Sequence, residues 1–115
     1  MDRTQQYIDD LKSTLDSLNR GQLNAMIDLF FYAQREQKQI FTFGNGGSGA
    51  TASHAAGDFI KGASFGLEKR FRMICLNDNI PSMMAIANDT SWSEIFVEAL
   101  KNYLSPGDVV SGISG

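Results

Sequence analysis

The chain has 115 residues, of which 43% are hydrophobic and 20% are charged, a composition typical of one globular domain and not of a disordered or fibrous chain. Its formal net charge is −3 and its longest basic run is Lys69-Arg70, so we do not expect direct nucleic-acid binding. The N-terminus has no apolar signal region, and no apolar stretch approaches the roughly 18 residues of a membrane span. With Cys75 as the only cysteine, within the apolar run 73–76, we expect a cytoplasmic protein without disulfides.

Two helices are predicted before the first strand. The apolar face of the first consists of Ile8, Leu11, Leu15 and Leu18, and that of the second of Leu23, Met26, Ile27, Phe30 and Phe31. The first helix is expected to end near Asn19-Arg20-Gly21. We therefore expect a helical hairpin over about residues 1–37, followed by an α/β part over about residues 38–115 of the same single domain.

The rest of the chain alternates between strand and helix patterns. Strands are predicted at 40–43, 71–76 and 109–113. Helices are predicted at 48–61, in a short segment opened by Pro81, and from Trp92 to about Leu104. Strands joined by helical crossovers indicate a parallel sheet with helices on both faces, in a doubly wound α/β architecture. Three strands are few for such a sheet, so we expect further chain or another subunit to cover its edge.

The segment Gly44-Asn-Gly-Gly-Ser-Gly49 connects the first of these strands to a helix. Its glycines allow positive φ angles and the approach of backbone N–H groups to an anion at a helix N-terminus. The segment lacks the lysine of a P-loop and departs from the dinucleotide pattern G-x-G-x-x-G. It predicts either an anion site or a tight turn without a ligand.

His54 and Asp58 are four residues apart and so share one face of the following helix. An imidazole and a carboxylate at this spacing can form an acid/base pair or provide two ligands to a divalent metal, although two ligands alone do not make a structural zinc site. The alternative is an ordinary hydrogen bond on a solvated helix face. Residues Asn88-Asp-Thr-Ser91 have the composition of a helix break followed by an N-cap.

Four of these motifs together resemble a known family. The segments Gly44–Ser48, His54 with Asp58, Ala85–Asp89 and Pro106–Ser114, in this order, are similar to the sugar isomerase (SIS) domain and, within it, to the phosphoheptose isomerase group. The resemblance runs from about Phe41 to the end of the chain. It implies a flavodoxin-like parallel sheet, preceded by the helical hairpin, of which this chain is the N-terminal portion.

The resemblance also implies a function and a set of site residues. Members of the group interconvert sedoheptulose 7-phosphate and glycero-manno-heptose 7-phosphate in a homo-oligomer, a dimer or a tetramer. The positions that match substrate-binding residues are Asn45, Gly46, Gly47, Ser48, Asn88, Asp89 and Ser114. His54 matches a zinc ligand of those members that bind zinc, and Asp58 stands where they have a glutamate that is both ligand and proton-transfer base. Further serine and threonine residues of the phosphate loop, and a glutamine and a histidine on a C-terminal helix, lie beyond the corresponding position in the family.

The expected reaction is therefore an aldose-ketose isomerisation through an enediol or enediolate, with Asp58 as the base. Aspartate is one methylene shorter than glutamate, which draws the carboxylate back by about 1.5 Å. A displacement of about 1 Å can cost on the order of a hundredfold in rate. Two alternatives stay open: a non-catalytic SIS module that binds a phosphosugar or a protein partner, and a folded fragment whose exposed edge serves assembly.

Overall fold

A computed structural model describes residues 2–115 of the chain and contains one parallel sheet of three strands. The strands are β1 (Gln39–Gly44), β2 (Arg72–Cys75) and β3 (Val109–Ile113), in the spatial order β2-β1-β3. Phe41 of the central strand lies opposite Ile74 on one side and Val110 on the other. The three predicted strands and the α/β class are confirmed.

One face of the sheet is covered by α2 (Arg20–Arg35) and α3 (Gly47–Gly57). The buried residues of this layer are Ala33, Ile40, Ala52, Ala56, Met73, Cys75 and Val109. At the far end of the layer, the ring of Phe30 in α2 meets the ring of Phe59 edge-on, with centroids 5.6 Å apart. The small alanines allow both helices to pack closely on the apolar strands. This packing holds α3 against the sheet, so that its first turn lies at the carboxyl edge of the sheet.

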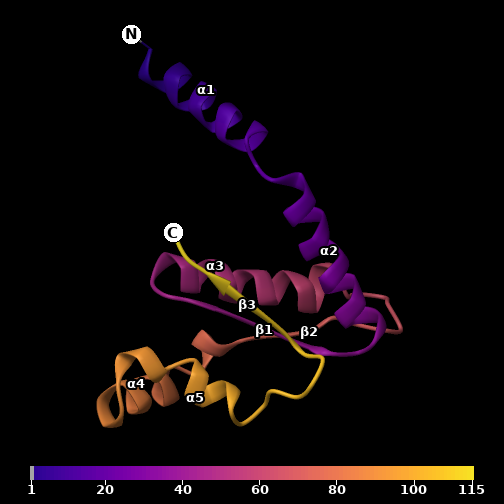
Figure 1. Cartoon of the computed structure of the whole chain (residues 1–115), viewed down its shortest axis with the longest axis vertical. Helices are drawn as coiled ribbons and strands as arrows, with labels where there is room; N and C mark the ends of the chain where they lie inside the picture. Colours follow the sequence, from indigo (N-terminus) through magenta and orange to yellow (C-terminus); the bar gives the residue numbers. More distant parts are fainter. Residues whose placement is uncertain (1) are drawn as a thin grey trace.

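The opposite face is covered by α4 (Ile80–Asp89), α5 (Val97–Leu100) and the turns around them, so the prediction of helices on both faces is confirmed. Figure 1 shows α4 and α5 across the sheet from α3. The ring of Phe41 stacks on Tyr103 with centroids 6.4 Å apart. This cover is incomplete, because Ile74 and Val110 on the outer strands are each more than 40% exposed.

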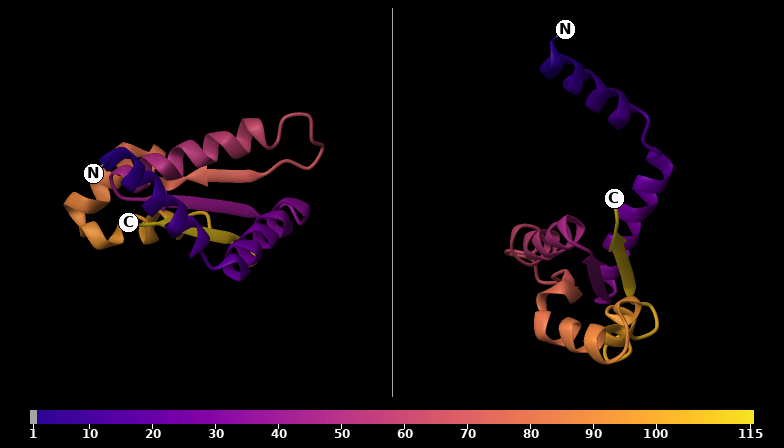
Figure 2. Two further views of the ribbon diagram at one scale, coloured as in Figure 1. Left: turned by 90° about the horizontal axis from the view of Figure 1, so that it is seen from above. Right: turned by 90° about the vertical axis from the view of Figure 1, so that its left-hand side faces the viewer.

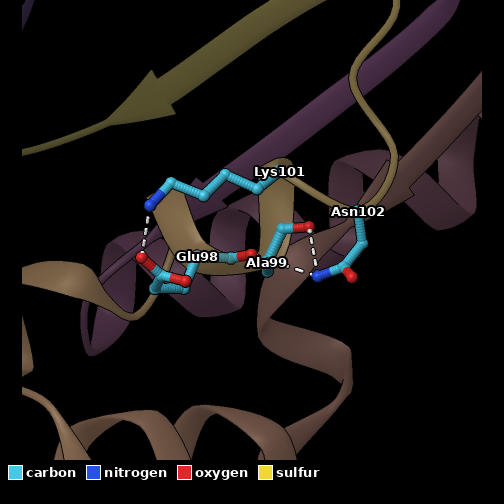
Figure 3. A network of polar contacts seen from close by, with 4 residues as sticks. All are labelled: Glu98, Ala99, Lys101 and Asn102. Carbon is cyan, nitrogen blue, oxygen red and sulfur yellow. Dashed lines mark hydrogen bonds and ion pairs between the residues drawn. The ribbon is translucent and has the colours of Figure 1, made fainter.

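The helix expected from Trp92 to Leu104 is broken, which corrects the sequence prediction. It begins as a single 3-10 turn, Trp92–Glu94, and continues as the four-residue α5. Figure 3 shows the reason for its early end: the side-chain amide of Asn102 donates to the carbonyls of Glu98 and Ala99, at 3.1 and 3.5 Å. An asparagine that bonds to nearby carbonyls offers the backbone an alternative to helix continuation. Lys101 pairs with Glu98 at the same turn, and this hydrogen bond raises the pKa of Lys101.

The N-terminal helices also differ from prediction. α1 (Arg3–Asp16) and α2 form an extended, bent arm and not a hairpin, and Figure 1 and the right-hand view of Figure 2 show α1 pointing away from the sheet. The link is short: Ser17 keeps a helical conformation and Asn19, extended, accepts from the N–H of Gln22 to cap α2. Such a link bends the chain without reversing it, and the apolar side chains Ile8, Leu11, Leu15 and Leu18 remain exposed. Within residues 2–115, no helix combines the length and the apolar character that crossing a bilayer requires.

Candidate functional site

The turn from β1 into α3 depends on two glycines. Gly46 has φ +56°, a conformation that side-chain-bearing residues rarely adopt. A Cβ on Gly44 would lie 2.7 Å from the backbone of Ser48 and 2.8 Å from the carbonyl oxygen of Ile113, so no larger residue fits there. The strand therefore passes directly into the helix at the carboxyl edge of the sheet, where ligands bind in open α/β folds.

Backbone N–H groups are available at this turn. The N–H groups of Ser48 and Gly49 donate to the carbonyl of Asn45, at 3.0 and 3.3 Å. Within residues 2–115, the N–H groups of Gly46 and Gly47 donate no hydrogen bond, and a Cβ on Gly47 would have no atom within 4 Å apart from its chain neighbours and the backbone of its own helix. The first turn of α3 thus offers N–H groups and free space to an anion.

A cleft of about 450 Å³ opens beside this turn. Its polar lining comes from Asn45 and Ser48 on one side and from Ser114, just after β3, on the other. Its apolar lining includes Phe43 and Phe96, whose ring centroids are 4.6 Å apart. Three residues expected in the site are therefore brought together although Ser114 lies 66 positions after Ser48 in the sequence.

His54 and Asp58 lie farther along α3. His54 Nδ1 is 3.0 Å from Asp58 Oδ2, and the two side chains are 80% and 68% exposed. Asp58 also begins a π-helical turn, Asp58–Gly62, a feature that is frequent at functional sites. At 1.5 Å per residue, Asp58 is about 15 Å from Ser48 along the helix axis. Neither side chain lines the cleft.

The expected zinc ligands do not form a complete metal site. Among residues 2–115, no three histidine, cysteine, aspartate or glutamate side chains gather where they can hold one ion. His54 and Asp58 supply two donors, whereas zinc in proteins takes three or four protein ligands. The residues described thus do not fit a zinc ion without ligands from elsewhere.

Asn88 and Asp89 lie at the exposed C-terminal end of α4. Asn88 Nδ2 donates to Asp89 Oδ1 at 2.9 Å, and within the described part of the chain no hydrogen bond joins either residue to the Gly44–Gly49 turn. The break after α4 follows the prediction, but Ser91 makes no side-chain cap for the turn that begins at Trp92. A role for Asn88 and Asp89 stays a prediction.

Sequence reasoning missed Asn77, which lies in the 3-10 turn Leu76–Asp78 that follows β2. Its side chain accepts from the N–H of Gly44 at 3.1 Å and donates to the carbonyl of the same residue. A polar amide immediately after a buried strand was the available signal, because such a residue lies at the carboxyl edge of the sheet. Phe96, between the turn Trp92–Glu94 and α5, also lines the cleft.

A profile of the SIS domain matches residues 6–115, nearly the whole chain. This chain belongs to the SIS domain family. The match includes α2 and most of α1, so the arm is part of the domain as the family defines it.

Curated relatives in the family include phosphoheptose isomerases. The phosphoheptose isomerase of Thermodesulfovibrio yellowstonii is 36% identical over 97 residues, which cover 84% of this chain and 47% of the relative. The probable phosphoheptose isomerase of Thermoplasma acidophilum is 35% identical over 112 residues, covering 91% and 61%. The SIS chain thus spans about half to three fifths of the length of these relatives.

A solved structure supports the fold. Phosphoheptose isomerase GmhA from Neisseria gonorrhoeae superimposes with a TM-score of 0.79 at 24% identity, covering 96% of this chain and 56% of that one. This likeness shows that the three-stranded sheet and its helices are arranged as in an SIS fold.

Proposed function

We propose that this SIS chain contributes to a phosphosugar isomerase, and that its substrate is sedoheptulose 7-phosphate, interconverted with glycero-manno-heptose 7-phosphate. The observation that carries the proposal is the cleft lined by Asn45, Ser48 and Ser114. It lies next to a turn in which, within residues 2–115, the N–H groups of Gly46 and Gly47 make no hydrogen bond. These are donors for the phosphate and hydroxyl groups of a sugar phosphate. Relatives that carry the name phosphoheptose isomerase support the same reaction.

The chemistry requires two separated groups. An aldose-ketose isomerase removes a proton from a carbon next to the carbonyl and returns it to the neighbouring carbon, through an enediol or enediolate. In a heptose 7-phosphate, the C1–C2 end and the phosphate are at opposite ends of the sugar. Asp58 and the Gly44–Gly49 turn lie at opposite ends of α3, as the reacting carbons and the phosphate lie at opposite ends of the sugar. We propose Asp58 as the base.

His54 has a positioning role in this proposal. Its Nδ1 contacts the Asp58 carboxylate, which orients the carboxylate on the exposed face of α3. If zinc takes part, His54 and Asp58 are the residues of this chain that hold it, together with ligands from outside residues 2–115. Zinc would then act as a Lewis acid on a sugar oxygen.

The direct test is proton exchange at the reacting carbon. The protein as its native cell produces it is incubated with sedoheptulose 7-phosphate in D₂O, and the sugar is followed by proton NMR. Deuterium incorporation next to the carbonyl, together with the appearance of the aldose, is the expected result. Binding of the sugar without any deuterium incorporation would reject the isomerase function.

That second outcome describes the alternative function, a non-catalytic SIS module that binds a phosphosugar. One observation favours it: the Asp58 carboxylate is 68% exposed and lines no cleft in this chain. Bases in isomerases are normally shielded from water, so catalysis requires another segment or subunit to cover Asp58.

We also propose that the protein is a homo-oligomer, a dimer or a tetramer, in the cytoplasm. The apolar stripe of α1 supports the assembly, because Leu15 is 53% exposed and lies with Ile8 and Leu11 on one helix face, and Leu18, just after the helix, is exposed too. A contiguous stripe of this kind on a soluble domain marks an interaction site. The free, buried Cys75 agrees with a reducing compartment.

A further inference from the structure

The side chain of Asn77 lies beneath the start of the Gly44–Gly49 turn. Its oxygen accepts from the N–H of Gly44 at 3.1 Å, and its nitrogen donates to the carbonyl oxygen of Gly44. One side-chain amide therefore satisfies both polar groups of the residue at which β1 ends. This pair of hydrogen bonds uses both the acceptor and the donor of the asparagine amide, and a hydrocarbon side chain can form neither.

The space around Asn77 is matched to its shape. A Cβ on Gly49 would lie 2.7 Å from Asn77 Nδ2 and 2.7 Å from the carbonyl oxygen of Gly44. Gly49 is buried, so Asn77 approaches it in the interior of the turn and not on its solvent side. The glycine in α3 and the asparagine after β2 thus fit one another, and together they set how closely the first turn of α3 approaches the end of β1.

The residue after Asn77 makes a second link to the same helix. The Ser53 hydroxyl donates to Asp78 Oδ1 at 2.6 Å, one helical turn beyond Gly49. The short 3-10 segment Leu76–Asp78 is therefore bound to the end of β1 through Asn77 and to α3 through Asp78, although it is separated from the turn by more than 20 residues in sequence.

We propose that Asn77 is a positioning residue of the candidate site: it holds Gly44 in place and thereby fixes the Gly44–Gly49 turn, whose residues Asn45 and Ser48 line the cleft. Asn77 does not line the cleft. It acts through the backbone of the turn. That the ligand is a sugar phosphate rests on the proposed function, whereas the control of the turn by Asn77 does not.

Asn79 provides a matched control. It is an asparagine two residues away, and its side chain also accepts from a backbone N–H, that of Ser82 at 3.2 Å. This bond caps α4, and within residues 2–115 the Asn79 side chain makes no hydrogen bond to the Gly44–Gly49 turn. Asn77→Ala and Asn79→Ala therefore remove the same kind of side chain from the same segment. Asn77→Asp is a second test variant of nearly identical shape, which keeps an acceptor for Gly44 N–H and loses the donor.

The experiment measures amide hydrogen exchange and ligand binding in the full chain. In Asn77→Ala we expect the amides of Gly44, Ser48 and Gly49 to exchange at least tenfold faster than in Asn79→Ala, with a smaller increase in Asn77→Asp. We expect the dissociation constants for inorganic phosphate and sedoheptulose 7-phosphate to rise about tenfold in Asn77→Ala, and KM to rise more than kcat falls where the protein is active.

Equal exchange of these amides in Asn77→Ala and Asn79→Ala would overturn the proposal, as would unchanged exchange in Asn77→Asp if the alanine variant does not fold. Failure of the wild-type protein to bind either phosphate compound would instead reject the proposed function. The exchange comparison would still decide the role of Asn77 in that case, so the two failures are distinguishable.

Discussion

The ring of Phe43, at the end of the central strand, lies 4.6 Å from the ring of Phe96, in the turn before α5. The two rings join the sheet to the broken helix on the apolar side of the candidate cleft. We expect Phe96→Ala to lower the free energy of unfolding by about 3 kcal/mol, the lower end for phenylalanine, because Phe96 is only partly buried. Urea unfolding measures the effect. Phe65→Ala, which removes a ring that is 74% exposed, is the control, and equal losses in the two variants would contradict this role.

The substitution Gly47→Ala is expected to change phosphate affinity without lowering stability. No described atom lies within 4 Å of a Cβ at this position, and the residue has no positive φ, so Gly47→Ala is expected to leave the melting temperature unchanged or slightly raised. The new methyl group occupies the space that an anion would use. We expect phosphate affinity, measured by calorimetry, to fall at least tenfold. Unchanged affinity would place the ligand elsewhere.

Gly46→Ala tests the turn itself. Its φ of +56° strains any residue with a side chain, so we expect a loss of about 1 to 3 kcal/mol in unfolding free energy. The measurement is the thermal unfolding of Gly46→Ala and of Gly47→Ala, which place the same methyl group at neighbouring positions of the turn. A stability equal to that of Gly47→Ala would show that the turn has another conformation in solution.

Asp58 is expected to matter for rate and not for stability. The His54–Asp58 pair is largely exposed, so Asp58→Asn should change the free energy of unfolding by less than about 1 kcal/mol. If Asp58 is the base, kcat should fall by about a hundredfold or more in the same variant. Glu68→Gln on the exposed loop after α3 is the control. An Asp58→Asn enzyme with normal kcat would remove Asp58 from the mechanism.

A charge on the apolar face of α1 is expected to dissociate the proposed oligomer. Leu15→Glu places a charge in the apolar stripe of α1, whereas Ser13→Glu places the same charge on the opposite side of the helix. We expect light scattering to show dissociation of the oligomer in the leucine variant alone. A wild-type protein that is monomeric at all concentrations would contradict the proposed assembly.

Cys75 should be chemically inert while the chain is folded. Burial is the main cause that raises the pKa of its thiol above the ordinary value, so little thiolate forms near neutral pH. We expect alkylation at pH 8 at least tenfold slower in buffer than in urea. The neutral thiol is favoured in the folded state, so its contribution to stability is present below the pKa of the unfolded thiol. It is lost as the pH rises through the higher folded pKa. Rapid alkylation of the folded protein would show that β2 opens readily.

The strands and the glycine turn were predictable because their signals are local. An apolar run at 40–43 and the glycines that follow it determine both the strand and its exit. The bend between α1 and α2 was not predictable from the apolar faces, because a stripe indicates that a helix has a partner but not where the partner lies. The early end of α5 coincides with a side-chain hydrogen bond from Asn102, and Asn77 contacts Gly44 across 33 residues of sequence, and neither interaction leaves a local sequence signal.

The measurement that tests the central claim most directly is a titration of the isotope-labelled protein with sedoheptulose 7-phosphate, followed by its backbone amide NMR signals. Binding in the cleft predicts that the largest shifts occur at Gly46, Gly47, Ser48 and Ser114, with Asn79 and the residues of α1 unaffected. Shifts confined to other surfaces, or no saturable shift at millimolar sugar phosphate, would contradict a phosphosugar site at this edge of the sheet.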